Sequence, residues 1–340
     1  MKLSFKFPVR HAKDNFSLGL DIGSSAIKAV KLELLKESTE LHAFNLEPAA
    51  NDLEPVLKKI LQSHDGRRVN ISVSGLAAII RYINFPKMKE EELKQALSFE
   101  AQKYIPFSLA EVNIDSYILK EDLPDNKMLV MLAAAKKEVI NQRLKLLDGI
   151  GVKVNVIDID SLALVNAFNF NYAEEESLKN KAVALLNMGA AFSNLNILEA
   201  GIPRLSRDIR IAGNTLTQKI ADILAVEFKA AEDLKLNPDK ERMDKVATAL
   251  ESALSFLAVE LRTSFDYYES QSASTVSKIF LSGGGSSLAG VKDTLANLLG
   301  IEVEFWDPIK KISPVKDADA GKIKQISAQL AVAVGLALRR

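Results

Sequence analysis

The segment LGLDIGSSAIKAV, which runs from Leu18 to Val30, decides how the chain begins to fold. Apolar residues alternate with other residues through 18–22 and again through 30–34, and a run of small residues separates the two halves. An alternation with period two on both sides of a glycine-containing turn predicts two paired strands. We therefore expect a β-hairpin with its tip at residues 23–25.

The tip of this hairpin has the composition of a phosphate-binding turn. Gly23 lets backbone N–H groups approach an anion closely. Ser24 and Ser25 add hydroxyl donors, and Lys28 adds a positive charge. The carboxylate of Asp21 would repel a phosphate unless a magnesium ion lies between them, directly or through water. A nucleotide with its metal explains both charges; a tight turn whose serines satisfy local backbone groups is the alternative.

A second segment, VALLNMGAAFSNLNILEAG at 183–201, repeats this plan. It is again an apolar alternation interrupted by a small-residue turn, which also carries Phe192 and Ser193. Two lobes built on one plan would explain the repeat, and their two tips would hold a phosphate chain from opposite sides. The alignment sets Asn187, Gly189, Ala190, Ala191 and Asn194 against Asp21, Gly23, Ser24, Ser25 and Lys28.

A third glycine-rich element is IFLSGGGSSLAGV at 279–291. We expect a strand, then the bare backbone of Gly283, Gly284 and Gly285, then a helix capped by Ser286 or Ser287. Such a backbone can lie against a base or sugar, and a helix N-terminus offers N–H groups to phosphate. A flexible connector is the alternative. The segment is neither a G-x-G-x-x-G fingerprint nor a P-loop.

Composition limits the classes of function. At 340 residues with 48% hydrophobic content, the chain is long enough for two lobes. Its 44 basic and 44 acidic residues balance, so no global field draws it to nucleic acid or anionic lipid. The absence of cysteine excludes disulfides and thiolate chemistry. The three histidines, His11, His42 and His64, have no helical metal-ligand spacing, so no histidine-based metal site is expected.

The chain shows neither a signal peptide nor a membrane span. No apolar stretch follows the positive charges at its start, and no run of about 18 apolar residues occurs anywhere. We therefore expect a cytosolic protein. Periodicity elsewhere predicts a mixed α/β chain, with a β-α-β-β-α module at about 81–155, a long helix over 249–271 and a buried closing helix over 328–338.

In this order of elements the chain resembles the actin-like ATPase superfamily, which includes actin, Hsp70 chaperones, sugar kinases and FtsA. It is more closely similar to the PilM family of type IV pilus assembly proteins, and the resemblance covers nearly the whole chain. Its fold would be two RNase H-like lobes around a nucleotide cleft. The segments that carry the resemblance lie at 19–33, 100–119, 206–220, 231–235, 260–271, 279–291 and 331–339.

The resemblance implies domain boundaries. Lobe I, subdomain 1A, would contain 1–80, 156–182 and 322–340. The inserted subdomain, 1C, would be 81–155. Lobe II would be 183–321, with subdomain 2A and a helical 2B at about 215–272.

The resemblance also implies ATP or ADP with Mg²⁺ as cofactors. Lys28 would reach phosphate oxygens, and Asp21 would contact the metal through water. Asp160, or Asp158, would lie near the attacking water, although strand-end and capping roles are at least as probable from the residues alone. The implied nucleotide contacts are Gly23, Ser24, Ser25, Lys28, Asn187, Gly189, Ala190, Ser193, Gly213, Asn214, Glu232, Lys235, Gly283, Gly284, Gly285 and Ser286.

Three of these positions depend on the resemblance alone or depart from the superfamily pattern. Glu232 and Lys235 read by themselves as an exposed helix pair at i, i+3. Asn187 stands where the superfamily usually has aspartate, and an amide neither attracts Mg²⁺ nor accepts a proton from water as a carboxylate does. We therefore expect the nucleotide to act mainly as a conformational clamp, with at most slow hydrolysis.

In PilM proteins the groove between 1A and 1C receives the N-terminal cytoplasmic tail of the inner-membrane protein PilN. The resemblance thus implies a cytoplasmic platform for pilus assembly, or for related type II secretion, that meets the membrane through this partner. It leaves open contacts with the pilus motor ATPases and self-association. An FtsA-like filament and a sugar-kinase-like phosphotransferase are the alternatives. Phe99, Tyr104 and Phe107 are interpreted as packing inside the inserted module.

Overall fold

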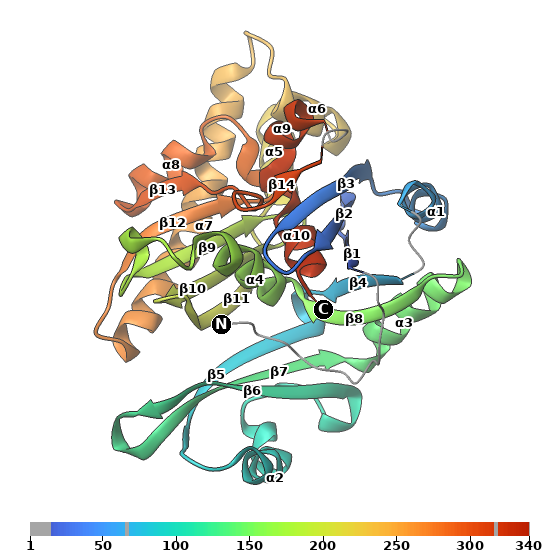
Figure 1. The fold of residues 1–340 in the computed structure, drawn as a ribbon. Helices are drawn as coiled ribbons and strands as arrows, with labels where there is room; N and C mark the ends of the chain where they lie inside the picture. Colours follow the sequence, from blue (N-terminus) through green and yellow to red (C-terminus); the bar gives the residue numbers. More distant parts are fainter. Residues whose placement is uncertain (1–14, 65–67, 316–318, 340) are drawn as a thin grey trace.

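The computed structural model describes residues 15–64, 68–315 and 319–339, and within these ranges its strands form three sheets (Figure 1). In spatial order, the first sheet contains β14 (Ser313–Pro314), β3 (Thr39–Pro48), β2 (Ala26–Leu34), β1 (Phe16–Ile22), β4 (Arg68–Val73) and β8 (Lys153–Ile159). The second sheet contains β11 (Ile202–Ile209), β10 (Ser193–Glu199), β9 (Ala182–Met188), β12 (Val276–Ser282) and β13 (Glu302–Phe305). The third, which we call the inserted sheet, contains β5 (Ala78–Pro86), β7 (Lys127–Lys136) and β6 (Val112–Leu123).

The first two sheets are built on the same plan. In each, an antiparallel meander of consecutive strands is extended by further strands that run parallel to its first strand. The register pairs Asp21 with Lys28 in the first sheet and Asn187 with Asn194 in the second. The internal repeat predicted from the sequence is therefore confirmed, including the alignment of Lys28 with Asn194.

Helices α4 (Asp160–Tyr172) and α10 (Ala331–Ala337) lie between the first and second sheets (Figure 1). Their buried side chains form one cluster with Val30 and Leu41 of the first sheet and with Leu185 and Phe280 of the second. On the outer face of the first sheet lie α1 (Glu54–Ser63) and α3 (Lys137–Gly149). The outer face of the second sheet is covered by α5 (Gly213–Leu224), α7 (Met243–Gln271) and α8 (Val291–Leu299).

The sequences of these helices match their positions. The segment SLALVNAF of α4 has apolar residues around its whole circumference, as a helix between two sheets requires. Every residue of α10 is buried. In α7 the buried residues recur every three or four positions, and Phe256 and Val259 on the other side stay exposed. Helix α7 therefore covers one sheet face only.

An aromatic cluster joins α4 to the second sheet. The ring of Phe168 lies with its centroid 4.9 Å from Phe280 and 5.3 Å from Trp306. The Tyr172 ring stacks on Phe168 at 4.9 Å, and the backbone N–H of Asp307 donates to the Tyr172 hydroxyl over 2.9 Å. Offset and edge-to-face pairs of this kind add to the area that they bury. The cluster therefore fixes α4 relative to the second lobe.

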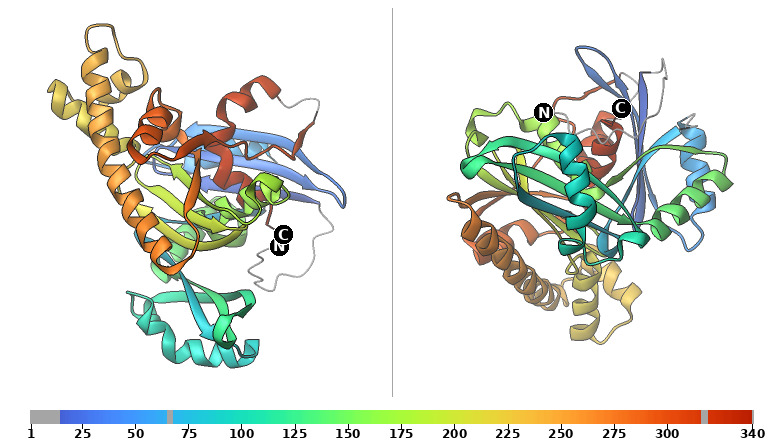
Figure 2. Two further views of the ribbon diagram at one scale, coloured as in Figure 1. Left: turned by 90° about the vertical axis from the view of Figure 1, so that its left-hand side faces the viewer. Right: turned by 90° about the horizontal axis from the view of Figure 1, so that it is seen from below.

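The inserted sheet projects from the rest of the molecule and carries α2 (Glu90–Glu100) on one face (Figure 2). Leu93 and Leu97 of α2 pack on Val130 and Leu132 of β7 in a separate cluster. Tyr104 and Phe107 pack against this cluster as predicted, but Phe99 is 83% exposed, so its assignment to the packing was wrong. Phe99 lies on the side of α2 that faces away from the sheet, whereas Leu93 and Leu97 face it.

The inserted sheet occupies 78–136, whereas the predicted module extends over 81–155. The remainder of that range is α3 and the start of β8. Leu147 of α3 packs with Leu18 and Leu57 in the cluster beneath α1, and β8 pairs with β4. The strand pairing therefore favours a narrower insertion; the other domain boundaries stay predictions.

The remaining elements are short. Helix α6 (Phe228–Leu236) packs against α5 and α7 in a small cluster of its own, and α9 (Ala320–Ile326) precedes α10.

None of the helices in the described parts of the chain is both long and apolar enough to cross a membrane. The 3₁₀ turns are η1 (Gly75–Ala77), η2 (Ala101–Lys103), η3 (Leu109–Glu111), η4 (Pro124–Asn126), η5 (Glu176–Leu178), η6 (Gly284–Ser287) and η7 (Ser327–Leu330).

Candidate functional site

The tip between β1 and β2 brings Asp21, Gly23 and Lys28 together. The Lys28 Nζ donates to the Asp21 carboxylate over 2.9 Å, and both side chains are mostly buried. A Cβ atom at Gly23 would lie 2.8 Å from the Ala26 carbonyl oxygen and 3.0 Å from the Lys28 Nζ, so this position requires glycine. Ser24 and Ser25 are exposed at the tip. The tip therefore presents hydroxyl groups to solvent above a paired acid and lysine.

The tip between β9 and β10 begins a polar ladder across the second sheet. The Ser282 hydroxyl donates to Asn187 Oδ1 over 3.2 Å, and Asn187 Nδ2 donates to Asn194 Oδ1 over 3.2 Å. Asn194 Nδ2 donates in turn to Asp208 on β11. Each pair occupies opposing register positions of neighbouring strands. The ladder fixes the orientation of the Asn187 amide and ends in a carboxylate.

The Asp208 carboxylate also contacts the first lobe. The backbone N–H of Gly75, in η1, hydrogen-bonds to Asp208, and burial raises the pKa of the Asp208 carboxyl. Next to this bond, a Cβ atom at Gly75 would lie 3.0 Å from the Phe192 ring, which comes from the second hairpin tip. Gly75 also has a φ of +64°, which favours glycine. The second tip therefore packs directly against the first lobe. This contact between the lobes was not predicted from the sequence.

The glycine-rich loop after β12 packs on the second hairpin tip. The Gly283 N–H donates to the Ala328 carbonyl over 2.8 Å, and a Cβ atom at Gly283 would lie 2.8 Å from Asn187 Oδ1. A Cβ atom at Gly285 would lie 3.1 Å from both the Met188 and the Gly189 carbonyl oxygens. At least two of these glycines are therefore needed for close approach of the two loops.

The predicted cap of the following helix was wrong. Helix α8 begins at Val291, after Gly290, and residues 284–287 form a separate 3₁₀ turn. The Ser286 hydroxyl is buried and donates to the Gly283 carbonyl over 2.7 Å. Similarly, the buried Ser193 hydroxyl donates to the Ile211 carbonyl over 2.7 Å. Both serines support their loops through these bonds.

The start of α5 connects the second tip to α6. The N–H groups of Gly213 and Asn214 donate to the carbonyls of Gly189 and Ala190 over 3.0 and 2.8 Å. The Gly213 carbonyl accepts a hydrogen bond of 3.3 Å from the Lys235 Nζ. Residues 189–190, 213–214 and 235 are thus one hydrogen-bonded unit.

Lys235 and Glu232 do not form an ordinary exposed helix pair. Lys235 is buried, and its Nζ lies 2.8 Å from Thr217 Oγ1 and 2.5 Å from Glu232 Oε2. The alternative that we gave for these two residues from spacing alone is therefore wrong. The pair holds α6 against α5 beside the second tip.

The two aspartates at the start of α4 differ in their surroundings. Asp160 lies close to Ser72 and Ser74, and burial, followed by the negative charge of Asp21, raises its pKa to about 7. A carboxyl group with that pKa exchanges protons near neutral pH, as a general acid or base does. The residue before the helix is Ile159, so Asp160 is not its N-cap. A role for Asp160 near the attacking water stays a prediction.

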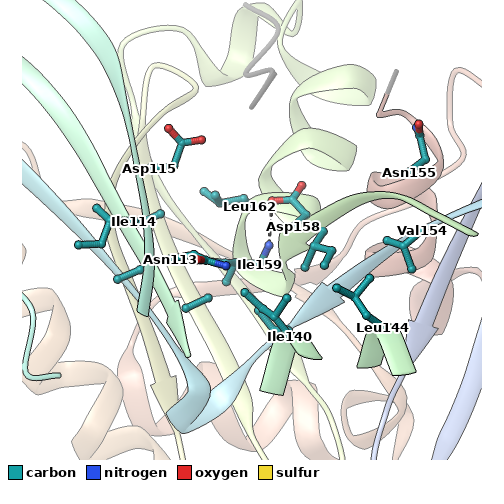
Figure 3. Close-up of a pocket in the computed structure, with 15 residues that line it drawn as sticks. Asn113, Ile114, Asp115, Ile140, Leu144, Val154, Asn155, Asp158, Ile159 and Leu162 are labelled. Atoms are coloured by element: carbon teal, nitrogen blue, oxygen red, sulfur yellow. Dashed lines mark hydrogen bonds between the residues drawn. The ribbon is translucent and has the colours of Figure 1, made fainter. Parts of the chain in front are cut away.

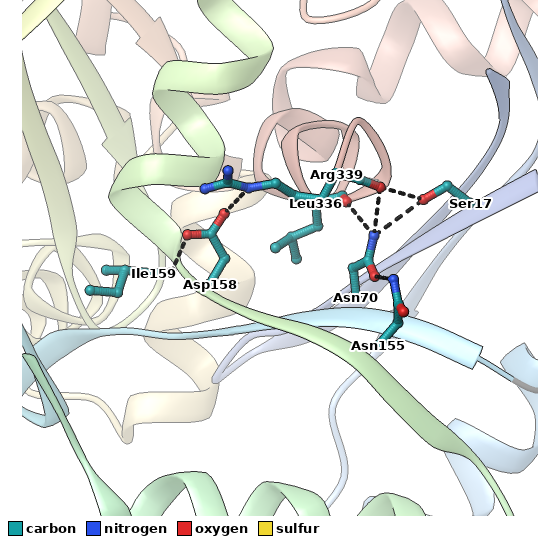
Figure 4. A network of polar contacts seen from close by, with 7 residues as sticks. All are labelled: Ser17, Asn70, Asn155, Asp158, Ile159, Leu336 and Arg339. Atoms are coloured by element: carbon teal, nitrogen blue, oxygen red, sulfur yellow. Dashed lines mark hydrogen bonds and ion pairs between the residues drawn. The ribbon is translucent and has the colours of Figure 1, made fainter. Parts of the chain in front are cut away.

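Asp158 belongs to a structural network at the end of α10 (Figure 4). Its Oδ2 pairs with the Arg339 Nε at 2.5 Å, and both side chains are almost fully buried. Asn70 on β4 donates to the backbone carbonyls of Leu336 and Arg339 over 2.9 and 3.1 Å. These contacts fasten the end of the chain to β4 and β8, so Asp158 is not a candidate for contact with the attacking water.

A groove of about 560 Å³ separates the inserted sheet from the first lobe. Its walls come from β4, β6, β7, α3, β8 and α4 (Figure 3). Ile140, Leu144 and Val154 give it an apolar side, and the Asp115 and Asp158 carboxylates lie on the opposite side. Burial raises the pKa of Asp115. Leu144 is 38% exposed at the rim, which leaves apolar surface open to a partner.

The duplicated sheets with helices between them, and the second hairpin tip packed against a glycine-rich loop, define a protein with the actin-like ATPase fold. The family model of the type IV pilus assembly protein PilM matches residues 19–340, and the chain belongs to this family. Family membership favours the pilus interpretation over the filament and sugar-kinase alternatives.

Several solved structures are similar to this chain. The structure described as the PilM–PilN type IV pilus biogenesis complex matches at a TM-score of 0.84 and 28% identity, over 95% of this chain and 97% of that one. The ethanolamine utilization protein EutJ from Carboxydothermus hydrogenoformans matches at a TM-score of 0.55 and 13% identity, over 98% of this chain and 92% of its own. MreB5 of Spiroplasma citri bound to ADP matches at a TM-score of 0.46 and 12% identity, over 94% of each chain.

Proposed function

We propose that this chain is a nucleotide-binding cytoplasmic platform of type IV pilus assembly that binds the N-terminal tail of a PilN-like inner-membrane protein. The observation that carries the proposal is the groove between the inserted sheet and the first lobe. The structure described as a PilM–PilN complex, at 28% identity, supports the choice of partner. Through this tail the platform associates indirectly with the membrane. It links the tail of the PilN-like protein to the cytoplasmic motor.

The chemistry of the groove suits an extended, mostly apolar peptide. Residues of β7 at 133–135 are alanines, so the wall leaves room for a second chain. Ile114 and Leu144, each 38% exposed, would cover apolar side chains of that peptide. Because Asp158 is already paired with Arg339, the carboxylate that is open to a donor from the tail is Asp115.

A substitution at the groove rim tests the partner. Leu144→Glu on α3 should weaken binding of a fluorescent N-terminal PilN-like peptide by about tenfold or more, because a charge replaces an apolar contact. Fluorescence anisotropy measures this affinity. The matched control is Leu298→Glu on α8, where the leucine is also 38% exposed but lies on the second lobe. Equal affinities for the two variants would contradict the proposal.

The second part of the proposal is that ATP or ADP binds between the two hairpin tips. Lys28 would exchange its bond to Asp21 for phosphate oxygens, and Asp21 would then face the water shell of Mg²⁺. Backbone N–H groups at the two tips would bind the remaining phosphate oxygens. When bound, the nucleotide supplies negative charge that holds the two tips together. The other predicted contacts, from Gly213 to Ser286, surround the same tips.

The nucleotide acts mainly as a clamp in this proposal. Asn187 offers no carboxylate, and the nearest one along the ladder, Asp208, is held by Asn194 and by the Gly75 backbone. Hydrolysis would therefore be slow, since activation of water needs a correctly placed acceptor. A change at the tips reaches the first lobe through Phe192 and Gly75.

Lys28→Ala should weaken ATP binding by about tenfold to 100-fold, because the variant loses a charge-assisted bond to phosphate. Isothermal titration calorimetry with ATP and Mg²⁺ measures the loss. Lys31→Ala on the same strand is the control, since its Nζ donates to the His64 carbonyl and not toward the tip. Circular dichroism of both variants verifies folding. Unchanged ATP affinity in Lys28→Ala would contradict nucleotide binding at this tip.

A further inference from the structure

Three ligand-type side chains gather at the end of the first hairpin that lies opposite its tip. Glu33 on β2 and Glu40 and His42 on β3 place their ligand atoms within 4.8 Å of one another. The His42 Nε2 lies 2.9 Å from Glu33 Oε2 and 3.8 Å from Glu40 Oε2. Two strand positions before Glu33, Lys31 donates to the carbonyl of His64, the residue that ends α1. The cluster therefore lies just beyond the part of the sheet that α1 covers.

The electrostatics of this cluster favour a cation. Glu33 and Glu40 are directly opposite each other in the β2–β3 pair, and like charges in that position destabilise a sheet. The neighbouring Lys31 is turned away, since its Nζ contacts the His64 carbonyl at 3.0 Å and the Phe16 ring at 4.7 Å. Among residues 15–64, 68–315 and 319–339, neither glutamate has a lysine or arginine within ion-pair distance.

The imidazole of His42 lies between the Phe16 ring and the two carboxylates. The Phe16 ring packs edge-on against it, with centroids 4.9 Å apart. Its Nε2 is shielded from solvent and, within the part of the chain that the structure describes, has no partner in hydrogen-bond geometry, although Glu33 is near. An imidazole nitrogen that lies beside two carboxylates is a typical arrangement of metal ligands.

We propose that Glu33, Glu40 and His42 bind a divalent transition-metal ion, with Zn²⁺ as the best match. One imidazole nitrogen and two carboxylate oxygens leave a fourth position for water, as in three-ligand zinc sites. Metal–ligand bonds of about 2.0–2.2 Å place the ligand atoms roughly 3–4 Å apart, so small side-chain rotations suffice. Mg²⁺ prefers oxygen ligands only, which separates this site from the metal expected with the nucleotide.

This proposal departs from the expectation that the chain has no histidine-based metal site. That expectation depended on pairs of histidines along one helix, whereas the ligands here come from opposing strands and include a single histidine. The ion would join β2 to β3 where β3 also pairs with β14, at Glu40 and Ser313. Its expected role is to fasten this edge of the first sheet.

Calorimetry on the untagged full chain, without nucleotide or Mg²⁺, tests the site with ZnCl₂. The wild type should bind one Zn²⁺, and Zn²⁺ should raise its melting temperature. Since loss of an outer-shell partner costs about 10–100-fold in affinity, His42→Ala and Glu33→Gln should cost about 100-fold or more. Co²⁺ as a probe should give visible absorption bands in the wild type that His42→Ala lacks.

Two controls match these variants. Glu47→Gln removes the same charge from β3, the strand of Glu40 and His42, at a residue paired with Lys59, and should leave Zn²⁺ affinity unchanged. His11→Ala removes another histidine and should also have no effect. Failure of the wild type to bind Zn²⁺ with one-to-one stoichiometry would overturn the proposal, as would undiminished binding by His42→Ala. In either case an ion pair of protonated His42 with Glu33 would account for the cluster.

Discussion

Gly335→Val should prevent the chain from folding to a soluble protein. Gly335 lies in α10, and a Cβ atom there would lie 3.0 Å from the Ala163 Cα and still closer to the Ala163 carbonyl. Ala163 belongs to α4, so the two helices between the sheets touch backbone to backbone at this point. Added atoms would push the helices apart, and both sheets pack on those helices. Overpacking of this size is among the few mechanisms that exceed about 4 kcal/mol.

Urea unfolding of Gly335→Ala measures the same effect if the valine variant yields no soluble protein. Even one methyl group requires a backbone shift, so we expect a loss of about 3 kcal/mol or more in the free energy of unfolding. Gly149→Ala is the matched control, because Gly149 is also a helical glycine but a Cβ atom there meets nothing within 4 Å. This variant should be neutral or slightly stabilising. A stable Gly335→Ala protein would refute the close packing.

Gly19 makes the corresponding contact from the first sheet. A Cβ atom at Gly19 would lie 2.5 Å from the Ala337 backbone nitrogen and closer still to the Ala333 carbonyl. Gly19 and Gly23 belong to the same opening segment, yet one serves helix packing and the other serves the hairpin tip. Alternation alone cannot separate these roles, because the packing partner of Gly19 lies more than 300 residues away in the chain.

The strands and their repetition were predictable because hydrophobic alternation is a local signal. The pairing of β1 with β2 and of β9 with β10 follows from two hairpins of the same plan, and the pairing of Asp21 with Lys28 could be aligned with that of Asn187 and Asn194. The start and the cap of the helix expected directly after the third glycine loop were wrong, since α8 begins only at Val291. Its apparent caps belong to a 3₁₀ turn that packs on the neighbouring loop.

The polar ladder and the side chains that line the groove could not be predicted, because their members meet only after folding. Asn187 has no carboxylate, but it is hydrogen-bonded to Asn194, and Asn194 is hydrogen-bonded to the carboxylate of Asp208 on β11. Asp208 lies inside a segment that the family resemblance had marked, but nothing in its spacing identifies it as the end of a hydrogen-bonded row. Likewise, the walls of the groove come from six separate elements.

Arg339→Met should destabilise the protein by about 3–5 kcal/mol, because it leaves the buried Asp158 carboxylate without its partner. Asp158 has 1% side-chain exposure, so water cannot replace the guanidinium. The loss of this ion pair would also affect the groove. Asp158 lines the groove, and the backbone carbonyl of Arg339 accepts a hydrogen bond from Asn70. We therefore expect weaker binding of the PilN-like peptide as well as lower stability.

Urea unfolding of Arg339→Met, Asp158→Asn and the double variant measures the coupling between the two side chains. The double variant should be more stable than the sum of the single losses indicates, because it removes the buried unpaired charge. Lys94→Met on α2 is the control, since the Lys94–Glu90 pair is exposed and its removal should have no measurable effect. If Arg339→Met unfolds at the same urea concentration as Lys94→Met, the Asp158–Arg339 pair does not fasten α10 to β8, and the groove must depend on the apolar packing of α3 and β7.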